Sequence, residues 1–437
     1  MFGLFNTFFI VKIFYIRESL VNAKQAESQA AAQAGSDTSA ADEAPLVGIQ
    51  KALAHNVPEY VDEIKPGGDV GDALLTGGTG FLGAHVLHEL LLNYDHMVYC
   101  LVRGRDDVSA EDRLRANMFY YFEMDIRPYL GNRVIVLEGD ITDREALRAA
   151  FANDFQTVFN CAASVKHFAD FSFLKSINVD GVKNLAELCV ETGRRLIHIS
   201  TVSVSGDVVG ADAQETTLTE NLLEIGQDTV SNGYVHTKFL AEKVILDMVG
   251  EQGLDAKIMR VGNLMSRQLD GEFQVNFNTN NFMSTLKSYV AMGCFPMSEM
   301  DEQDEFSPID ETAHAIVLLA GTDSKFTVFH PYNSHTVEMG NIIQAMQGCG
   351  LAIDVVDDER FGARLREALA DDAINAFVSP LVNYNLDDDE MRFENPASNR
   401  FTVKALYRLG FQWSITETRY LEQAIEMMQM LGFFDLE

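Results

Sequence analysis

The chain has 437 residues, of which 47% are hydrophobic and 22% are charged, and its formal net charge is −32 at pH 7. This composition is typical of a globular protein long enough to bury a sizeable core, and it excludes a collagen-like or wholly disordered chain. The negative charge disfavours a general nucleic-acid binder and adhesion to anionic membranes, so a bound phosphate would have to meet local cations.

The first 45 residues differ from the rest of the chain. Residues 2–16 are nearly all apolar, but this run is too short to span a bilayer, contains Lys12, and lacks a basic leader and a small-residue cleavage site. This apolar run is either a membrane or partner anchor, or extra sequence from an incorrectly assigned start of the gene. We favour the second interpretation. An Ala-, Gln- and Ser-rich linker follows, so we predict that residues 1–45 are disordered.

Short apolar runs and helical patterns alternate between residues 46 and 265. The predicted strands cover 72–76, 97–102, 133–137, 157–160, 196–200 and 256–261. The predicted helices cover 81–93, 144–151, 179–192 and 233–249. Strands that are apolar throughout and separated by helices indicate an α/β fold with a doubly wound parallel sheet, whose ligand crevice lies at the carboxyl ends of the strands.

The pattern changes after residue 265. Asn- and Phe-rich loops, a helix over 311–320 and mixed segments continue to residue 437. We therefore predict a Rossmann-type dinucleotide-binding domain over 46–265 and a smaller substrate domain over 266–437. Within the second range, about 305–332 is expected to return to the first domain.

A glycine-rich turn, TGGTGFLG, joins the first predicted strand to the first predicted helix. Gly77 would allow the tight turn, Gly80 would let the backbone approach a pyrophosphate, and Gly83 would permit close packing of helix on strand. The anion would then lie at the helix N-terminus, where free N–H groups and the helix dipole favour negative charge. The turn therefore predicts a dinucleotide site.

The end of the second strand indicates which nicotinamide cofactor binds. An NAD enzyme usually carries a carboxylate here, but this strand ends in Arg103 and has no carboxylate before Asp106. Arg103, with Arg113 on the next helix, could grip a 2′-phosphate. Arg105 is as easily explained as a solvated surface charge. We therefore expect NADP rather than NAD.

Tyr234 and Lys238 lie one turn apart in the helix predicted over 233–249, about 6 Å along its axis. A nearby ammonium is expected to lower the pKa of a phenol, which would let Tyr234 exchange a proton with a substrate oxygen near neutral pH. A third polar group should end the strand over 196–200. Thr201 is that candidate, and Ser200 and Ser203 are neighbours that could be mistaken for it.

The five cysteines show no C-x-x-C pair and no metal-ligand spacing. Reduced thiols in a cytoplasmic protein are the expectation, and no metal site is predicted.

Several motifs in chain order resemble the extended short-chain dehydrogenase/reductases, namely TGGTGFLG, NCAASVKHF, INVDG, HISTVSVSG, YVHTK and RVGNL. More specifically, the chain is similar to the thioester reductase domains that end nonribosomal peptide synthetases and carboxylic acid reductases. This likeness rests on LLTGGTGFLGAHVLHELL, CLVRG, RVGNLMSR, FSPIDETAHAIVLL and GFQWSITETRYLEQAI, and it covers residues 48–434.

The resemblance implies roles for individual residues. It implies a catalytic triad of Thr201, Tyr234 and Lys238, with Asp140 near the adenine and Asn178 holding the catalytic helix through a water. The cofactor-lining residues that it implies are Gly77, Thr79, Gly80, Phe81, Leu82, Arg103, Asp140, Ala162, Tyr234, Lys238 and Asn263.

The resemblance also implies an activity. An acyl or peptidyl thioester on the phosphopantetheine of a carrier protein would receive hydride from NADPH and leave as an aldehyde, with a further reduction to an alcohol left open. The sequence contains no carrier-type Gly-Gly-x-Ser site, so the carrier would act in trans or belong to another polypeptide. Two alternatives stay open: an extended reductase or epimerase acting on free acyl-CoA or a sugar nucleotide, and a non-catalytic NADP-binding sensor.

Overall fold

The computed structural model describes residues 45–105, 108–165, 170–209, 216–274, 281–371, 373–385, 392–394 and 396–436. The disorder predicted for residues 1–45 therefore stays a prediction, because all but the last of these residues lie outside the described ranges. The same holds for most of the VKHF motif and for part of the Asn- and Phe-rich loop.

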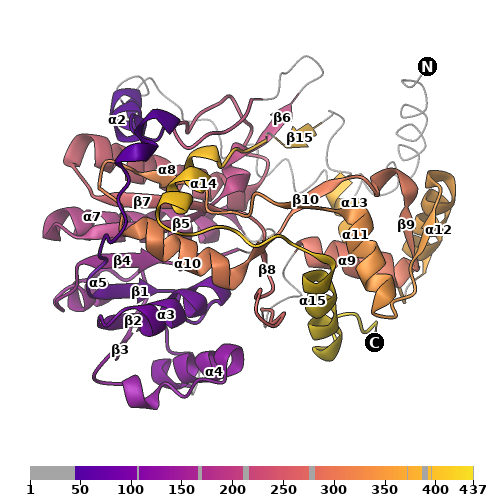
Figure 1. The fold of residues 1–437 in the computed structure, drawn as a ribbon, viewed down its shortest axis with the longest axis horizontal. Helices are drawn as coiled ribbons and strands as arrows, with labels where there is room; N and C mark the ends of the chain where they lie inside the picture. The colour runs from indigo at the N-terminus through magenta and orange to yellow at the C-terminus, as the bar shows by residue number, and fades with distance from the viewer. Residues whose placement is uncertain are drawn as a thin grey trace. The chain divides into compact units, whose positions relative to one another are not determined.

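Seven parallel strands form one sheet in the order β12-β7-β5-β4-β1-β2-β3 (Figure 1). The strands are β1 (Ala73–Thr76), β2 (Val98–Val102), β3 (Val134–Glu138), β4 (Thr157–Asn160), β5 (Arg195–Thr201), β7 (Ala256–Val261) and β12 (Val328–Phe329). The strand order reverses between β4 and β1, and in sheets of this kind ligands bind outside the carboxyl ends of the strands at that point. This arrangement confirms the predicted doubly wound parallel sheet.

Helices cover both faces of the sheet (Figure 1). Leu75, Phe159 and Ile197 belong to an apolar core shared with four helices, and Leu74 and Val158 belong to a second core on the opposite face. The first core is completed by α3 (Phe81–Asn93), α4 (Ala110–Phe122), α10 (Ile309–Ala320) and α14 (Arg400–Arg408). The second is completed by α2 (Pro45–Leu53), α5 (Arg144–Ala150), α7 (Val182–Thr192) and α8 (Gly233–Gln252).

A third apolar core lies in the part of the chain after residue 264. Its helices are α9 (Asn281–Met292), α11 (Met339–Gly348), α12 (Asp358–Ala370), α13 (Asn375–Asn385) and α15 (Thr418–Met430). Two-stranded pairs accompany it, and these are β8 (Leu264–Met265) with β11 (Ser307–Pro308), β9 (Cys294–Pro296) with β14 (Asp354–Val356), and β10 (Gln303–Glu305) with β13 (Thr336–Glu338). The proposed domain boundary near residue 265 stays a prediction.

The chain returns to the main sheet twice after residue 265. α10 and β12 form the first return, and α14 with Phe411 and Trp413 forms the second, in which side chains join the core on the α3 face. The sequence analysis expected a return over about 305–332 but did not foresee the one after residue 400.

Short elements complete the described chain. They are α6 (Phe171–Lys175), a π-helical turn over Ser176–Gly181, 3-10 turns over Pro58–Glu63, Arg127–Tyr129, Val202–Ser205 and Met297–Glu299, and the antiparallel pair β6 (Asp207–Val209) with β15 (Arg392–Glu394). The π-helical turn replaces the beginning of the helix predicted over 179–192.

All five cysteines lie in the described ranges, and each is a free thiol. No helix that the structure describes combines the length and the apolar character that crossing a bilayer requires.

Candidate active site

The glycine-rich turn connects the end of β1 to the start of α3. Gly77 has φ +74°, and a Cβ on it would lie 2.5 Å from the carbonyl carbon of Cys161, while a Cβ on Gly83 would lie 2.2 Å from the oxygen of Gly77. Neither position therefore accepts a side chain without moving backbone. Gly80 is the N-cap of α3 and has no side chain to cap the first amides, which suits them to an anion.

The other residues predicted around this turn can serve mainly through their backbone. Leu82 is 7% exposed and belongs to the core, and Phe81 packs against His85, Tyr121 and Phe273 at ring distances of 5.2–5.7 Å. The amide nitrogen of Ala162 would lie 2.6 Å from a Cβ on Gly77, so this residue borders the turn. The turn, α3 and the end of β4 thus form a cradle that fits a dinucleotide phosphate.

Three arginines gather beyond the end of β2. Arg113 on α4 donates a hydrogen bond from Nη1 to the carbonyl oxygen of Arg103. Burial lowers the pKa of Arg113, and the positive charges of Arg103 and Arg105 lower it further. Like charges held this close favour an anion between them. Because its charge acts on Arg113, Arg105 belongs to the same group as the two predicted arginines.

Asp140 lies beside this group, after β3. Its Oδ1 accepts hydrogen bonds of 2.9 Å from the amide and the hydroxyl of Thr142, and its Oδ2 lies 3.3 Å from Nη1 of Arg103. Because the Arg103 side chain is 65% exposed, this ion pair is screened by water and leaves Arg103 available to a ligand.

The catalytic helix predicted from YVHTK is α8. Asn232 caps it, because its Oδ1 accepts hydrogen bonds from the amides of Tyr234 (3.1 Å) and Val235 (3.2 Å). The helix begins at Gly233 as predicted and continues three residues beyond the predicted end, to Gln252. Tyr234 therefore lies in the first turn of α8, and Lys238 follows one turn later.

Lys238 is buried against the end of β5. It is 3% exposed, and its Nζ donates a hydrogen bond of 2.8 Å to the carbonyl oxygen of Ile199, two residues before Thr201. Burial lowers the pKa of Lys238 to about 8, although the charges of Glu242 and Cys161 act in the opposite direction. The structure thus brings the predicted amine next to the predicted strand end.

The phenol of Tyr234 differs from the expectation. Burial raises its pKa to about 12, whereas the sequence analysis expected Lys238 to lower it. The expected direction was wrong for this structure because removing the phenolate from water outweighs any attraction to the ammonium. A phenol with this pKa is fully protonated near neutral pH, which suits a proton donor.

Thr201 and Ser200 point to opposite faces of β5. The Ser200 hydroxyl donates to Oε1 of Glu242 inside the core and is 2% exposed, so it is turned away from the crevice. Thr201 Oγ1 accepts a hydrogen bond from the amide of Ser203 and donates one to Ser203 Oγ, both at 3.2 Å. This geometry favours Thr201 over Ser200, and its catalytic role stays a prediction.

Asn178 joins the end of β4 to α8. Its side chain exchanges hydrogen bonds with the backbone of Ser164 (2.8 and 3.0 Å), and its Nδ2 donates to Thr237 Oγ1 at 3.1 Å. The contact with the helix is therefore direct, whereas the resemblance implied one through a water.

A buried charge network below the site was missed by the sequence analysis. Arg260 on β7 and Glu242 on α8 are both 0% exposed, and their side chains are joined by hydrogen bonds of 2.7–3.1 Å. Arg260 also contacts Nε2 of His330 at 3.1 Å and donates to the carbonyl oxygen of Leu222. A buried ion pair with these additional hydrogen bonds fixes α8 against the sheet.

Asn263 follows β7, whose Val261 is the register partner of Thr201. Its amide donates to Oε2 of Glu305 at 2.6 Å, a contact that the sequence analysis also missed. Nothing in the run DEQDEF distinguishes this carboxylate from its solvated neighbours.

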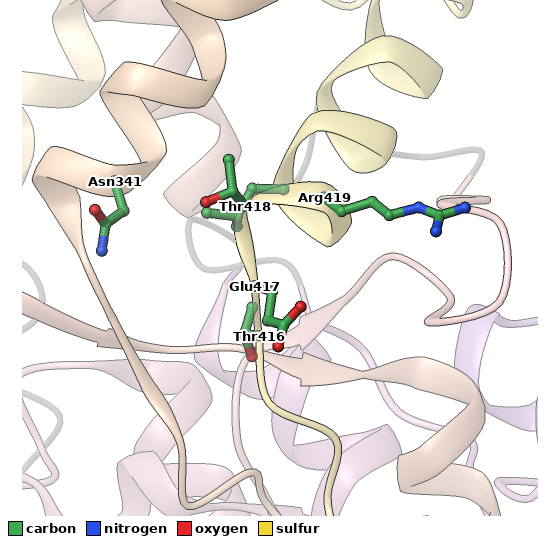
Figure 2. Close-up of a pocket in the computed structure, with 6 residues that line it drawn as sticks. Asn341, Thr416, Glu417, Thr418 and Arg419 are labelled. Carbon is green, nitrogen blue, oxygen red and sulfur yellow. The ribbon is translucent and has the colours of Figure 1, made fainter.

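A surface hollow of about 400 Å³ lies at the N-terminal end of α15 (Figure 2). It is lined by Asn341, Thr416, Glu417, Thr418, Arg419 and Leu421. Figure 2 shows the Arg419 side chain extending away from Asn341, so these polar groups do not converge on one point. None of the predicted site residues lines this hollow.

Known proteins similar to this chain include a peptide synthase and a reductase that are much longer than it is. The chain is 26% identical over 372 residues to a linear gramicidin synthase of Brevibacillus parabrevis, covering 81% of this chain and 7% of that protein. It is 27% identical over 374 residues to a carboxylic acid reductase of Mycobacterium tuberculosis, covering 76% of this chain and 31% of that protein. The chain therefore spans less than a third of the length of these curated relatives.

Solved structures show a similarity to the same class of proteins. A thiolation-reductase di-domain from an archaeal non-ribosomal peptide synthetase superposes with a TM-score of 0.79 and 32% identity, covering 89% of this chain and 81% of that one. These similarities confirm the resemblance predicted from the sequence motifs. A family model described as male sterility protein matches residues 75–316, more than half of the sequence, and the chain therefore belongs to this family of NAD(P)-binding domains.

Proposed function

We propose that this protein is an NADPH-dependent thioester reductase that releases a carrier-bound acyl or peptidyl chain as an aldehyde. The observation that carries the proposal is the position of Lys238, buried against the carbonyl of Ile199 at the carboxyl end of β5, on the same helix as Tyr234. The similarity to the reductase part of a thiolation-reductase di-domain supports the thioester chemistry.

The cradle around Gly77, Gly80 and Gly83 would hold the pyrophosphate, and Lys238 would bind the ribose next to the nicotinamide. Arg103 and Arg113, with Arg105 nearby, would bind a 2′-phosphate, which supports NADPH over NADH. The backbone of Thr79, Phe81, Leu82 and Ala162 would line the same cradle, and Asp140 would approach the adenine. When bound, the reduced nicotinamide supplies a hydride to the thioester carbonyl carbon.

Tyr234 and Thr201 would act on the carbonyl oxygen. As negative charge develops on that oxygen, the two hydroxyl groups donate hydrogen bonds to it, and Tyr234 transfers its proton. Lys238 stabilises the resulting phenolate by its charge. The product is a hemithioacetal, whose carbon–sulfur bond then breaks, so that the carrier thiol takes up the hydroxyl proton and the acyl chain leaves as an aldehyde.

A phosphopantetheinyl carrier protein is the proposed partner. The names of the related synthetase and of the di-domain support a carrier as the source of the substrate, and the match covers only part of each of these proteins. The five free thiols support a reducing compartment, and we propose the cytoplasm.

The test mixes the protein with NADPH and either an acyl-carrier thioester or the matching acyl-CoA. Loss of the reduced nicotinamide absorbance, release of free thiol and an aldehyde or alcohol identified by mass spectrometry are expected with the carrier thioester. Equal turnover of acyl-CoA would favour the reductase acting on free thioesters. Tight NADPH binding without turnover of any thioester would favour the sensor and overturn the proposal.

A further inference from the structure

Glu305 is the last residue of β10, and its carboxylate binds two other segments of the chain. Oε2 accepts the hydrogen bond from the amide of Asn263, and Oε1 accepts one from the hydroxyl of Ser307. The Asn263 side chain also donates to the carbonyl oxygen of Glu305 at 3.3 Å. Three hydrogen bonds thus connect this residue to the turn after β7 and to β11.

The contacts continue from Ser307 to two further segments. Ser307 Oγ accepts a hydrogen bond of 2.8 Å from the amide of Asn333, whose Nδ2 donates to the carbonyl oxygen of Ser414 (3.1 Å) and to Thr416 Oγ1 (3.3 Å). Four segments connect the sheet-packed part of the chain with the third core, and these lie at 263, 305–307, 333 and 414–416. Glu305 therefore lies at one end of a chain of hydrogen bonds through every one of these segments.

The carboxylate is packed tightly against Gly262. A Cβ on Gly262 would lie 2.1 Å from Oε2 of Glu305 and 2.7 Å from Cβ of Tyr332. No side chain fits between the backbone of Gly262 and this carboxylate. The position of Glu305 therefore determines the position of the Gly262–Asn263 turn.

This turn lies at the proposed site of reaction. Val261 is paired in register with Thr201, and Asn263 comes two residues later, beyond the carboxyl end of the sheet. We propose that Glu305 is a positioning residue, whose carboxylate holds the Gly262–Asn263 turn beside Thr201 and so keeps Asn263 at the nicotinamide end of the crevice. The inference rests on the proposed thioester reductase function.

The charge state of Glu305 follows from its surroundings. Burial raises the pKa of Glu305 to about 7, and the negative charge of Asp304 also raises it. The hydrogen bonds from Ser307 and from the amides of Asn263 and Asn333 act in the opposite direction and lower it. The other titratable groups that act on it among the described residues are Tyr332, after β12, and Tyr420 on α15. Because burial favours the neutral carboxyl, the folded protein binds this proton more tightly than the unfolded chain does, and lowering the pH through about 7 does not weaken the packing of the turn.

The experiment compares E305Q and E305D with wild type, with E302Q as the matched control, since Glu302 is an exposed carboxylate in the same segment. The first measurement is amide hydrogen exchange of the peptide over 261–265 in the cofactor-free protein. Faster exchange than wild type is expected in E305Q, an intermediate rate in E305D and the wild-type rate in E302Q. Wild-type protection in E305Q would overturn the inference.

The second measurement is the steady-state kinetics of turnover at saturating NADPH and varied carrier thioester. A displaced turn is expected to lower the kcat of E305Q by ~10- to 100-fold with little change in the KM for the thioester, since small errors in orientation cost this much. A kcat of E305Q equal to that of wild type would overturn the assignment.

The two proposals fail in different ways. A wild-type protein that reduces no thioester contradicts the proposed function, and the exchange measurement still reports whether Glu305 fixes the turn. A wild-type protein that reduces thioesters, with E305Q matching it in kcat and exchange, contradicts only the role of Glu305.

Discussion

At the β2 end of the crevice Arg103 is exposed to water, whereas at the β5 and β7 end Lys238, Glu242 and Arg260 are buried. The Arg103 side chain is 65% exposed, but Lys238 is 3% exposed and Glu242 and Arg260 are 0% exposed. Exposed charges are screened by water and ions, so they suit recognition of an anionic cofactor. Burial lowers the pKa of Lys238 and raises the pKa of Tyr234, and displaced pKa values suit proton transfer. In the proposed function, the first end selects the cofactor and the second performs the chemistry.

Replacing the proton donor should give the largest effect and act only at the buried end. We expect Y234F to fold and to bind NADPH with wild-type affinity, but to lose about 10²- to 10⁴-fold in kcat, the usual contribution of a positioned proton donor. Steady-state kinetics and a fluorescence titration with NADPH check this. Full activity in Y234F would remove the phenol from the mechanism.

Replacing each of the two hydroxyls at the end of β5 should distinguish the side chain that faces the crevice from the one that faces the core. T201V should lower kcat by about 10²- to 10³-fold, because one donor to the developing oxyanion is lost. S200A should lower the melting temperature, because Glu242 loses a buried partner, and should change kcat far less. The reverse pattern in kcat would make Ser200 the functional hydroxyl.

At the exposed end, R103A should weaken NADPH binding by ~10- to 100-fold, the equivalent of one charge-assisted contact, and leave NADH binding unchanged. Saturating NADPH should restore wild-type kcat. R115A is the matched control, because Arg115 lies on α4 two residues after Arg113 but pairs with Asp112. An equal loss of affinity for both cofactors in R103A would argue against recognition of the 2′-phosphate.

The smallest predicted effect is an alkaline limb in the pH profile of kcat. Lys238 is charged below its pKa of about 8, so activity should fall about tenfold per pH unit above that value. Stability should change in the opposite direction: the unfolded chain still binds this proton up to about pH 10, so the free energy of unfolding rises with pH between about 8 and 10. If the loss of kcat above about pH 8 persists in K238M, it does not come from the titration of Lys238.

Much of the fold could be predicted because its signals are local. The strands over 157–160 and 256–261 and the helix over 81–93 have the predicted bounds, since each is one apolar run or one helical pattern bounded by turn residues. The π-helical turn at Ser176–Gly181 was not predicted, because the sequence pattern there continues the helical period of α7.

The site could be predicted only in part. The glycine turn and the Tyr234–Lys238 pair are short motifs, so spacing alone indicates them. The contacts of Glu305 with Asn263 and of Glu242 with Arg260 join residues 42 and 18 positions apart, and no local pattern encodes them. The pKa of Tyr234 depends on how deeply tertiary packing removes the phenol from water, which the spacing of Tyr and Lys does not reveal.

The central claim is that one end of the crevice selects the cofactor and the other performs the chemistry. Its most direct test measures the NADPH dissociation constant and the single-turnover rate of thioester reduction on the same preparations of Y234F and R103A. We expect Y234F to change only the single-turnover rate of thioester reduction, and R103A to change only the NADPH dissociation constant. A loss of NADPH affinity in Y234F, or a slow single turnover of R103A saturated with NADPH, would contradict it.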